Sequence, residues 1–185
     1  MSVTLIVEDV GHLKFELYCE QVPKTCRNFL ALAAAGFYNG TKFHRNIKGF
    51  IIQGGDPTNT GKGGESIFGG TFEDEVVADL KHDRRGILAM ANSGLNKNLS
   101  QFFITYGKHA TLDGKFTVFG HLVDGFQTLD LLENEPVDKH NKPLNNLVVS
   151  DIEINCNPIA EIDFSYEQER AERAVEKKVD IEISD

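Results

Sequence analysis

The chain has 185 residues, of which 41% are hydrophobic and 25% are charged, values that fit one globular domain with a sizeable core and a short appendage. Its formal net charge of −9 argues against a basic face for phosphates, so direct nucleic-acid binding is not expected. No run reaches the roughly 18 apolar residues of a membrane span, and no signal peptide is recognisable at the start. We therefore expect an intracellular protein, without a membrane segment, whose ligands are proteins or small molecules.

Cysteine and histidine residues show no spacing typical of a disulfide framework or a metal site. The three cysteines, Cys19, Cys26 and Cys156, are odd in number and form no CxxC pair, so we expect buried free thiols. The six histidines are scattered without an HxxxH or HExxH pattern. The sequence therefore predicts neither a bound metal nor a cofactor.

The first third of the chain predicts a hairpin, a helix and two short strands. Apolar and polar residues alternate over residues 3–7 and 13–17, on either side of an Asp-Val-Gly turn. Pro23 suits a first helical position, and apolar residues follow it at helical spacing until Gly36. Residues 40–53 then read as two short strands.

Residues 54–70 are rich in glycine and resemble a phosphate-binding loop at first sight. The spacing contradicts that interpretation, because five residues separate Gly55 from the Gly61-Lys62 pair and Gly63 stands where a magnesium-ligating serine or threonine is required. A tight surface loop with backbone turns is the better interpretation.

An acidic cluster, FEDE at residues 72–75, follows the glycine-rich loop. Carboxylates can ligate calcium, but this cluster lacks the alternating DxDxDG spacing of such a site. A solvated loop is therefore predicted for these residues.

The second half of the chain repeats the pattern of short strands and adds another helix. Residues 92–100, rich in Asn, Gly and Ser, predict a loop, and an Asp-Gly pair opens a helix with Phe126, Leu129 and Leu132 on one face. Further strands are predicted at residues 86–91, 101–105, 116–123 and 147–154. Many short strands with two helices favour a β-barrel or a sandwich.

The composition changes after Pro158, which divides a domain at residues 1–158 from an extension at residues 159–185. Residues 161–185 hold nine acidic and four basic residues, and pairs such as Glu169 with Arg173 support a charged helix. The helical spacing runs through Phe164, Gln168, Ala171, Val175 and Val179. Both a solvated extension and a helix that docks onto a partner fit this pattern.

Several separated strings identify a family. They are FHRNIKGFIIQGGDPTNTGKGG, FEDE, MANSG, SQFFITYG and LDGKFTVFG. In order and spacing they resemble the cyclophilins, the cyclosporin-binding peptidyl-prolyl cis-trans isomerases, over roughly residues 2–158. VPKTCRNFLAL, NIKGF and NCNP are most similar to the single-domain cyclophilin J type. The resemblance implies a mainly β fold, a closed eight-stranded antiparallel barrel with a helix over each end, followed here by the short charged helix.

The reaction of that family requires little covalent chemistry. Rotation about an X-Pro bond breaks amide conjugation, against a barrier of about 18–20 kcal/mol, and needs no nucleophile or metal. An apolar pocket for the proline ring, donors for the peptide and a cation near the imide nitrogen would lower the barrier. A guanidinium suits this role because it stays charged and presents fixed donors, and Arg45 is the candidate.

The resemblance assigns the other site residues by position. Arg45 falls on the catalytic arginine, and Gln53 and Asn92 fall on donors to the substrate backbone. The proline pocket is implied at Phe50, Ile51, Phe103 and Leu112, the adjoining groove at Gly61, Ala91, Ser93 and Gln101, and the rim at Thr111 and Phe116. His44, beside Arg45, is expected to be structural.

Some positions depart from the best-known cyclophilins. Thr111 replaces a tryptophan that hydrogen-bonds cyclosporin and Phe116 replaces a histidine, so a cyclosporin-like ligand should bind with reduced affinity while proline turnover survives. Leu99 replaces a glycine whose backbone angle leucine would dislike. Further replacements are Ile51 for methionine, Ser93 for alanine and Leu95 for proline.

Two functions fit this pattern. The first is an active isomerase of X-Pro bonds in peptides and proteins, and the second is a proline-binding scaffold module of a larger assembly. The cyclophilin J resemblance implies spliceosomal partners, and the chain is expected in the nucleus, the cytoplasm or both.

Overall fold

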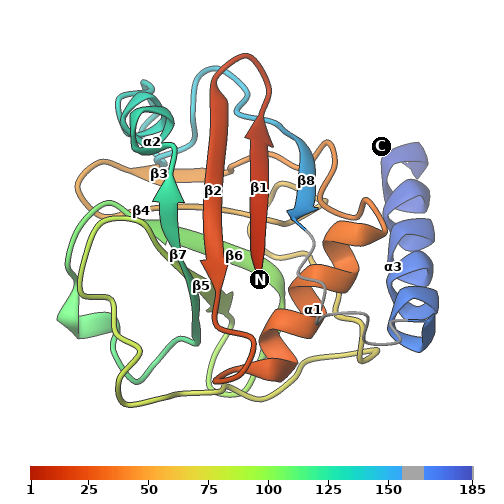
Figure 1. Cartoon of the computed structure of the whole chain (residues 1–185). Helices are drawn as coiled ribbons and strands as arrows, with labels where there is room; N and C mark the ends of the chain where they lie inside the picture. Colours follow the sequence, from red (N-terminus) through yellow and green to blue (C-terminus); the bar gives the residue numbers. More distant parts are fainter. Residues whose placement is uncertain (156–164, 185) are drawn as a thin grey trace.

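The computed structural model describes residues 1–155 and 165–184, which form eight strands and three α-helices (Figure 1). The strands are β1 (Ser2–Val7), β2 (Gly11–Leu17), β3 (Arg45–Ile47), β4 (Ile51–Gly54), β5 (Ile87–Asn92), β6 (Asn98–Thr105), β7 (Val118–Asp124) and β8 (Val149–Asn155). The helices are α1 (Pro23–Ala34), α2 (Phe126–Glu133) and α3 (Ser165–Ser184), with a 3-10 turn, η1 (Ala110–Leu112). Within this described part, no helix has the length and apolarity needed to cross a membrane.

The strands form one curled antiparallel sheet in the order β3-β4-β6-β5-β7-β2-β1-β8. Backbone hydrogen bonds join its two ends, since the Phe43 N–H donates to the Leu147 carbonyl at 2.9 Å and the Val149 N–H donates to the Thr41 carbonyl at 2.8 Å. Figure 1 shows α1 and α2 at opposite ends of the curled sheet. The predicted eight-stranded antiparallel barrel with its two covering helices is confirmed.

Aromatic side chains fill the main core between the barrel and α1. The ring of Phe29 on α1 lies 5.2 Å from Tyr38, 5.7 Å from Phe102 and 5.1 Å from Phe119, measured between ring centroids. All four side chains are at most 1% exposed. Tilted and edge-on packing of this kind adds to the stabilisation from burial, so α1 is fixed against the sheet.

The first turn of α1 is capped from a distant part of the chain. No side chain at its own start forms a cap, although Pro23 occupies the predicted first helical position. The Glu75 carboxylate instead accepts hydrogen bonds from the Thr25 N–H at 2.6 Å and the Thr25 hydroxyl at 2.7 Å, and Glu73 pairs with the Lys24 ammonium at 2.8 Å. The predicted loop is confirmed, because residues 73–75 belong to no helix or strand. Glu75 is not simply solvated, however, since its carboxylate satisfies a free N–H group of a helix start.

α3 packs along α1 (Figure 1), so the predicted charged helix is confirmed over residues 165–184. Ala171 and Ala174 are buried, and the buried Lys178 ammonium donates to the carbonyls of Phe37, at 3.0 Å, and Asn39. Val179, part of the predicted stripe, is 46% exposed. The packed face of α3 contains the small alanines because they let two helices approach closely. Two residues named in the sequence predictions, Phe164 and Cys156, lie outside the described residues.

Other boundaries differ from the sequence prediction in small ways. β6 begins at Asn98 rather than after the predicted loop, because Asn98 pairs with Asn92 and its side-chain amide donates to the Phe72 carbonyl at 3.1 Å. On α2, Leu129 is fully buried but Phe126 is 44% exposed. The short helix covers the barrel end with its later turn only.

Candidate active site

The barrel strands carry apolar side chains on both faces, and the outward side chains form a second cluster. Successive residues of a strand point to opposite faces, so in β6 Phe102 enters the main core while Phe103 belongs to the outer cluster. The buried members of the outer cluster are Ile51, Ile87, Ala89, Phe103 and Val118, and Phe50, Ala91, Leu112 and Phe116 pack against it half-buried. The positions assigned to the proline pocket therefore meet in one apolar surface.

Phe103 lies at the centre of this surface. Its side chain is 2% exposed, and its ring meets the Phe116 ring edge-on at 5.5 Å. Phe50 contacts the ring of His109 at 4.8 Å, also edge-on. Contacts between rings hold these aromatic side chains in place, so the apolar surface has a fixed shape.

Strand register places Arg45 beside the apolar surface. Arg45 pairs with Gln53 across β3 and β4, and Gln53 pairs with Phe103 across β4 and β6. Directly opposed residues of an antiparallel pair share one face of the sheet, so the three side chains stand in a row. Arg45 is exposed, and its guanidinium makes no hydrogen bond or ion pair with other residues in the described ranges. Its donors are therefore available to a ligand.

A groove of about 280 Å³ adjoins this row. The Gln53 amide donates to the Gln101 side-chain carbonyl at 2.9 Å, and the Gln101 amide donates to the Gly63 carbonyl at 2.8 Å. The predicted groove residues Gly61, Ala91, Ser93 and Gln101 all line it. The two residues predicted as donors to the substrate backbone, Gln53 and Asn92, line it as well, and the structure adds Lys62, Gly63, Lys97 and Leu99. Leu99 has no left-handed backbone angle, so the expected conflict at this position is absent.

Apart from Arg45, which stands in the row described above, Thr111 is the one predicted site residue that lies in neither the outer cluster nor the groove lining. It is exposed on η1, next to the half-buried Leu112. Asn92 does line the groove, where its amide donates to the Lys115 carbonyl at 3.1 Å and its side-chain oxygen accepts from the Gly94 N–H at 3.2 Å.

Asp56, which sequence reasoning missed, organises the glycine-rich loop. Its buried carboxylate accepts backbone N–H bonds from Thr58 at 2.8 Å, from Gly61 at 2.7 Å and from Gly63 at 3.2 Å. Burial opposes ionisation, but these hydrogen bonds outweigh it and lower the pKa of Asp56. A Cβ on Gly63 would lie 2.3 Å from the Asp56 carboxylate. The loop amides are therefore directed at an internal anion, which fits the predicted surface loop.

His82 is a second missed residue, and it supports the apolar surface from behind. Its ring is 1% exposed and stacks on Phe103 at 5.7 Å with an interplanar angle of 12°. Its Nδ1 lies 2.9 Å from an Asp113 carboxylate oxygen, which also accepts the His82 backbone N–H at 2.8 Å. Burial lowers the pKa of His82 against the opposing effect of Asp113. A neutral His82 thus ties Phe103 to the segment after Leu112.

His44 is half-buried near the glycine-rich loop. A Cβ on Gly61 would lie 3.4 Å from its Nε2, and its buried Nδ1 has no hydrogen-bond partner among the described residues. Burial lowers the pKa of His44, although Asp56 acts in the opposite direction. A neutral ring in this place fits the structural role expected for it.

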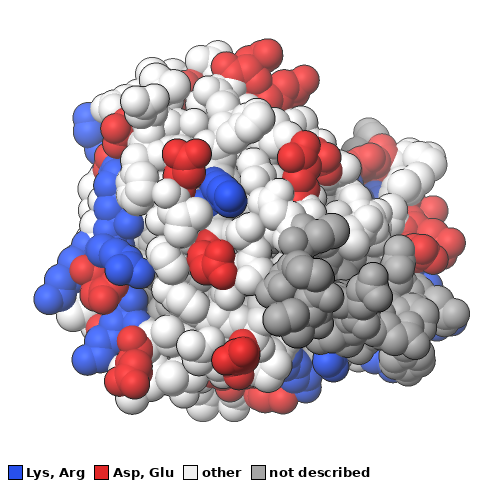
Figure 2. Space-filling view, in the orientation of Figure 1, with Lys and Arg blue, Asp and Glu red and all other residues white. Residues whose placement is uncertain are grey.

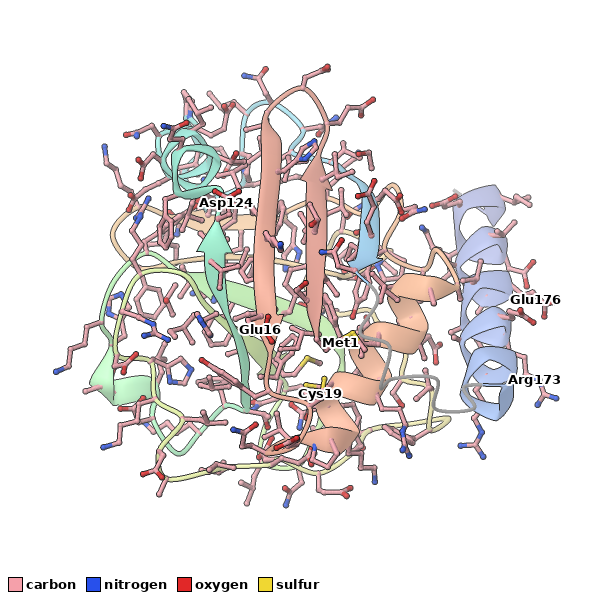
Figure 3. The ribbon with its side chains drawn as sticks, in the orientation of Figure 1. Met1, Glu16, Cys19, Asp124, Arg173 and Glu176 are labelled. Atoms are coloured by element: carbon pink, nitrogen blue, oxygen red, sulfur yellow. The ribbon has the colours of Figure 1, made fainter. Side chains whose placement is uncertain are left out.

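The two described cysteines lie close together near the N-terminus. Cys19 and Cys26 are free thiols, Cys26 buried and Cys19 half-buried. A hydrogen bond between them lowers the pKa of Cys19 to about 7, against the effect of burial. The Met1 ammonium, which lies 3.0 Å from the Glu16 carboxylate (Figure 3), acts in the same direction. No His, Cys, Asp and Glu cluster suited to a metal ion occurs within residues 1–155 and 165–184.

Comparison with known proteins agrees with this geometry. A family model described as cyclophilin type peptidyl-prolyl cis-trans isomerase/CLD matches residues 2–154, which covers all eight strands except the last residue of β8. The chain therefore belongs to the cyclophilin family of peptidyl-prolyl cis-trans isomerases.

Individual relatives make the family placement more specific. Proteins named peptidyl-prolyl cis-trans isomerase-like 3 from Rattus norvegicus and Homo sapiens are each 59% identical over 162 residues, which cover 87% of this chain and 100% of each relative. A crystal structure of a cyclophilin type isomerase from Cryptosporidium parvum, determined in the presence of the dipeptide Ala-Pro, is 57% identical. The two structures superpose with a TM-score of 0.83, and the matched region covers 85% of this chain and 100% of the Cryptosporidium parvum chain.

Proposed function

We propose that this isomerase acts on X-Pro bonds of peptides and proteins and that Arg45 is its catalytic group. The observation that carries the proposal is the row Arg45, Gln53, Phe103, in which strand pairing sets a free guanidinium beside an apolar pocket. The proline ring would occupy the pocket at Phe103, while the amides of Gln53 and Asn92 hold the peptide backbone. The Ala-Pro dipeptide present with the Cryptosporidium parvum relative supports this class of ligand.

The proposed mechanism uses binding that strengthens as the amide twists. In the planar ground state the imide nitrogen has little lone-pair density, because the lone pair is delocalised into the carbonyl. Rotation localises that pair, and a guanidinium N–H of Arg45 can then donate to it. An interaction made only in the transition state lowers the barrier without tightening ground-state binding.

Exchange NMR on a short Ala-Pro peptide tests this proposal. Wild-type protein should accelerate cis-trans exchange, and Arg45→Ala should reduce the catalysed rate roughly 100-fold. No acceleration by a folded wild-type protein would instead favour the alternative, a weakly active or inactive proline-binding scaffold.

The partners and the location of the protein form a finer proposal. Resemblance to the cyclophilin J type supports an intracellular protein of the nucleus or cytoplasm that associates with spliceosomal proteins. A tagged full-length chain should then co-fractionate with small nuclear ribonucleoproteins from a cell extract. Elution at its own molecular mass, in an extract whose ribonucleoproteins are intact, would count against this association.

We propose that cyclosporin binds this protein more weakly than it binds cyclophilins that have a tryptophan at the rim. The exposed Thr111 side chain has neither the area nor the N–H donor of an indole. Thr111→Trp should therefore raise cyclosporin affinity about tenfold in a calorimetric titration. Unchanged affinity in this variant would show that the rim residue does not set the binding.

A further inference from the structure

α3 forms one wall of a second hollow, which is separate from the groove lined by Gln53 and Gln101. The hollow has a volume of about 240 Å³ and lies between α3 and residues 65–69. None of its lining residues lines the groove. α3 also lies outside residues 2–154, which match the cyclophilin model, so the assignment of the family gives this hollow no role.

The hollow is basic although the whole chain is acidic. Arg170, Arg173 and Lys177 line it from α3, at a spacing of three and four residues that sets them on one side of a helix. Among the described residues that line it, Glu65 is the one carboxylate, and it lies 3.5 Å from the Lys177 ammonium. The described lining therefore holds three cations and one anion, in a chain of formal charge −9. Figure 2 shows acidic side chains spread over the barrel.

The cations stand on a fixed support. Ala171 and Ala174 are buried in the contact of α3 with the domain, and Lys178 bonds the Phe37 carbonyl at 3.0 Å. The Arg170 guanidinium donates to the Ile67 carbonyl at 3.3 Å across the hollow, and Figure 3 shows Arg173 projecting from α3. A ligand that binds here does not have to order the helix, which reduces the entropic cost of binding.

We propose that this hollow binds an acidic peptide segment in an extended conformation. Arg170 and Lys177 are seven residues apart, roughly 10 Å along a helix. An extended peptide in the polyproline II conformation rises about 3.1 Å per residue and brings every third side chain to the same side. Carboxylates three residues apart therefore match both ends of the row. Phe68 and Ile67 add an apolar floor for the intervening backbone and side chains.

Charge favours a short peptide over a nucleic acid. Fields around a protein decay over about 8 Å at physiological ionic strength, so a short acidic segment experiences mainly the local cations. A long polyanion also meets the acidic remainder of the chain, whose formal charge is −9. The loop that supplies Gly63 to the proline groove supplies Glu65 to the hollow, so one partner chain can reach both sites, although binding of the acidic segment itself requires no proline.

The test uses the acetylated peptide Glu-Gly-Gly-Glu-Gly-Gly-Glu, titrated into the full-length protein at low ionic strength and followed by NMR shifts. The double variant Arg173→Glu, Lys177→Glu should bind at least about tenfold more weakly. The control Lys14→Glu, Lys139→Glu carries the same charge change at exposed residues outside the hollow and should stay within about twofold of wild type. Glu65→Gln should bind more tightly, because it removes the competing carboxylate.

Amide exchange at Ala171 and Ala174 reports whether α3 stays docked in each variant. If the charge reversal undocks it, Arg173→Gln with Lys177→Gln repeats the comparison without adding negative charge. Equal affinity for all variants, or equal loss in the control, would overturn the proposal. So would displacement of the peptide by an equal concentration of inorganic phosphate, or tighter binding of a single-stranded oligonucleotide of the same charge. Arg45→Ala should leave binding of the acidic peptide to the hollow unchanged. The result of this test is therefore distinguishable from that of the isomerase test.

Discussion

The row of Arg45, Gln53 and Phe103 and the attachment of α3 hold their side chains by different means. Hydrogen-bonded strands fix the three residues of the row, and the His82 ring stacks on Phe103 from behind. The attachment of α3 relies on two alanines and on the buried ammonium of Lys178. The row thus depends on backbone pairing across the barrel, whereas the helix depends on a few side chains. Substitutions at the row should therefore affect the stability of the whole domain, and substitutions at the attachment should affect mainly α3.

The largest effect on stability is expected at the centre of the apolar surface. Phe103→Ala removes a ring that is 2% exposed and should lower the free energy of unfolding by about 3–5 kcal/mol. Phe126→Ala is the matched control, because that ring is 44% exposed and its loss should cost less than about 1 kcal/mol. Urea denaturation measures both, and similar values for the two variants would contradict the central place given to Phe103.

A smaller and more local effect is expected where α3 is attached. Lys178→Met keeps the length of the side chain but leaves the Phe37 and Asn39 carbonyls without this donor, at a cost of about 1–3 kcal/mol. Hydrogen exchange should increase along α3 while isomerase activity stays the same. Lys177→Met is the control, since that side chain is 64% exposed. Loss of activity in Lys178→Met alone would show that the two regions are coupled.

The smallest effect is expected in the loop beside the groove, and it depends on pH. The pKa of Asp56 is lower in the folded protein than its ordinary value, so its contribution to stability is complete above about pH 4. That contribution is lost as the pH falls through the lowered folded-state pKa. Asp56→Asn should therefore lower stability at pH 7, and the difference from wild type should shrink toward pH 2. A difference independent of pH would exclude the charged carboxylate as its cause.

Local sequence patterns were sufficient to predict the hairpin, α1 and most strands. The alternation over residues 3–7 and 13–17 matches β1 and β2, and Pro23 begins α1 as predicted. These features depend on neighbouring residues, whose periodicity is visible in the sequence. The residues of the candidate site were found through the family resemblance, because no local pattern separates Phe103 of the apolar surface from the core residue Phe102.

Contacts between distant residues could not be read from the sequence. Glu75 caps a helix that begins about fifty residues earlier, and His82 reaches Asp113 from another loop. Ala171 and Val175 of the predicted stripe on α3 do pack against the domain, but Ala174 and Lys178 were missed. An apolar stripe gives no weight to small residues or to a lysine with buried acceptors. Asp56 did have a local signal, since an aspartate followed by Pro, Thr, Asn, Thr and Gly is typical of a side-chain-stabilised turn.

The central claim is that Arg45 acts on the twisted amide while the apolar surface and the adjoining groove bind the substrate. Its most direct test measures two quantities for Arg45→Ala, the catalysed exchange rate of an Ala-Pro peptide and the dissociation constant of that peptide. The rate should fall roughly 100-fold while the dissociation constant changes less than about threefold. A variant that keeps the wild-type rate, or one whose lower rate is fully explained by weaker binding, would contradict the claim.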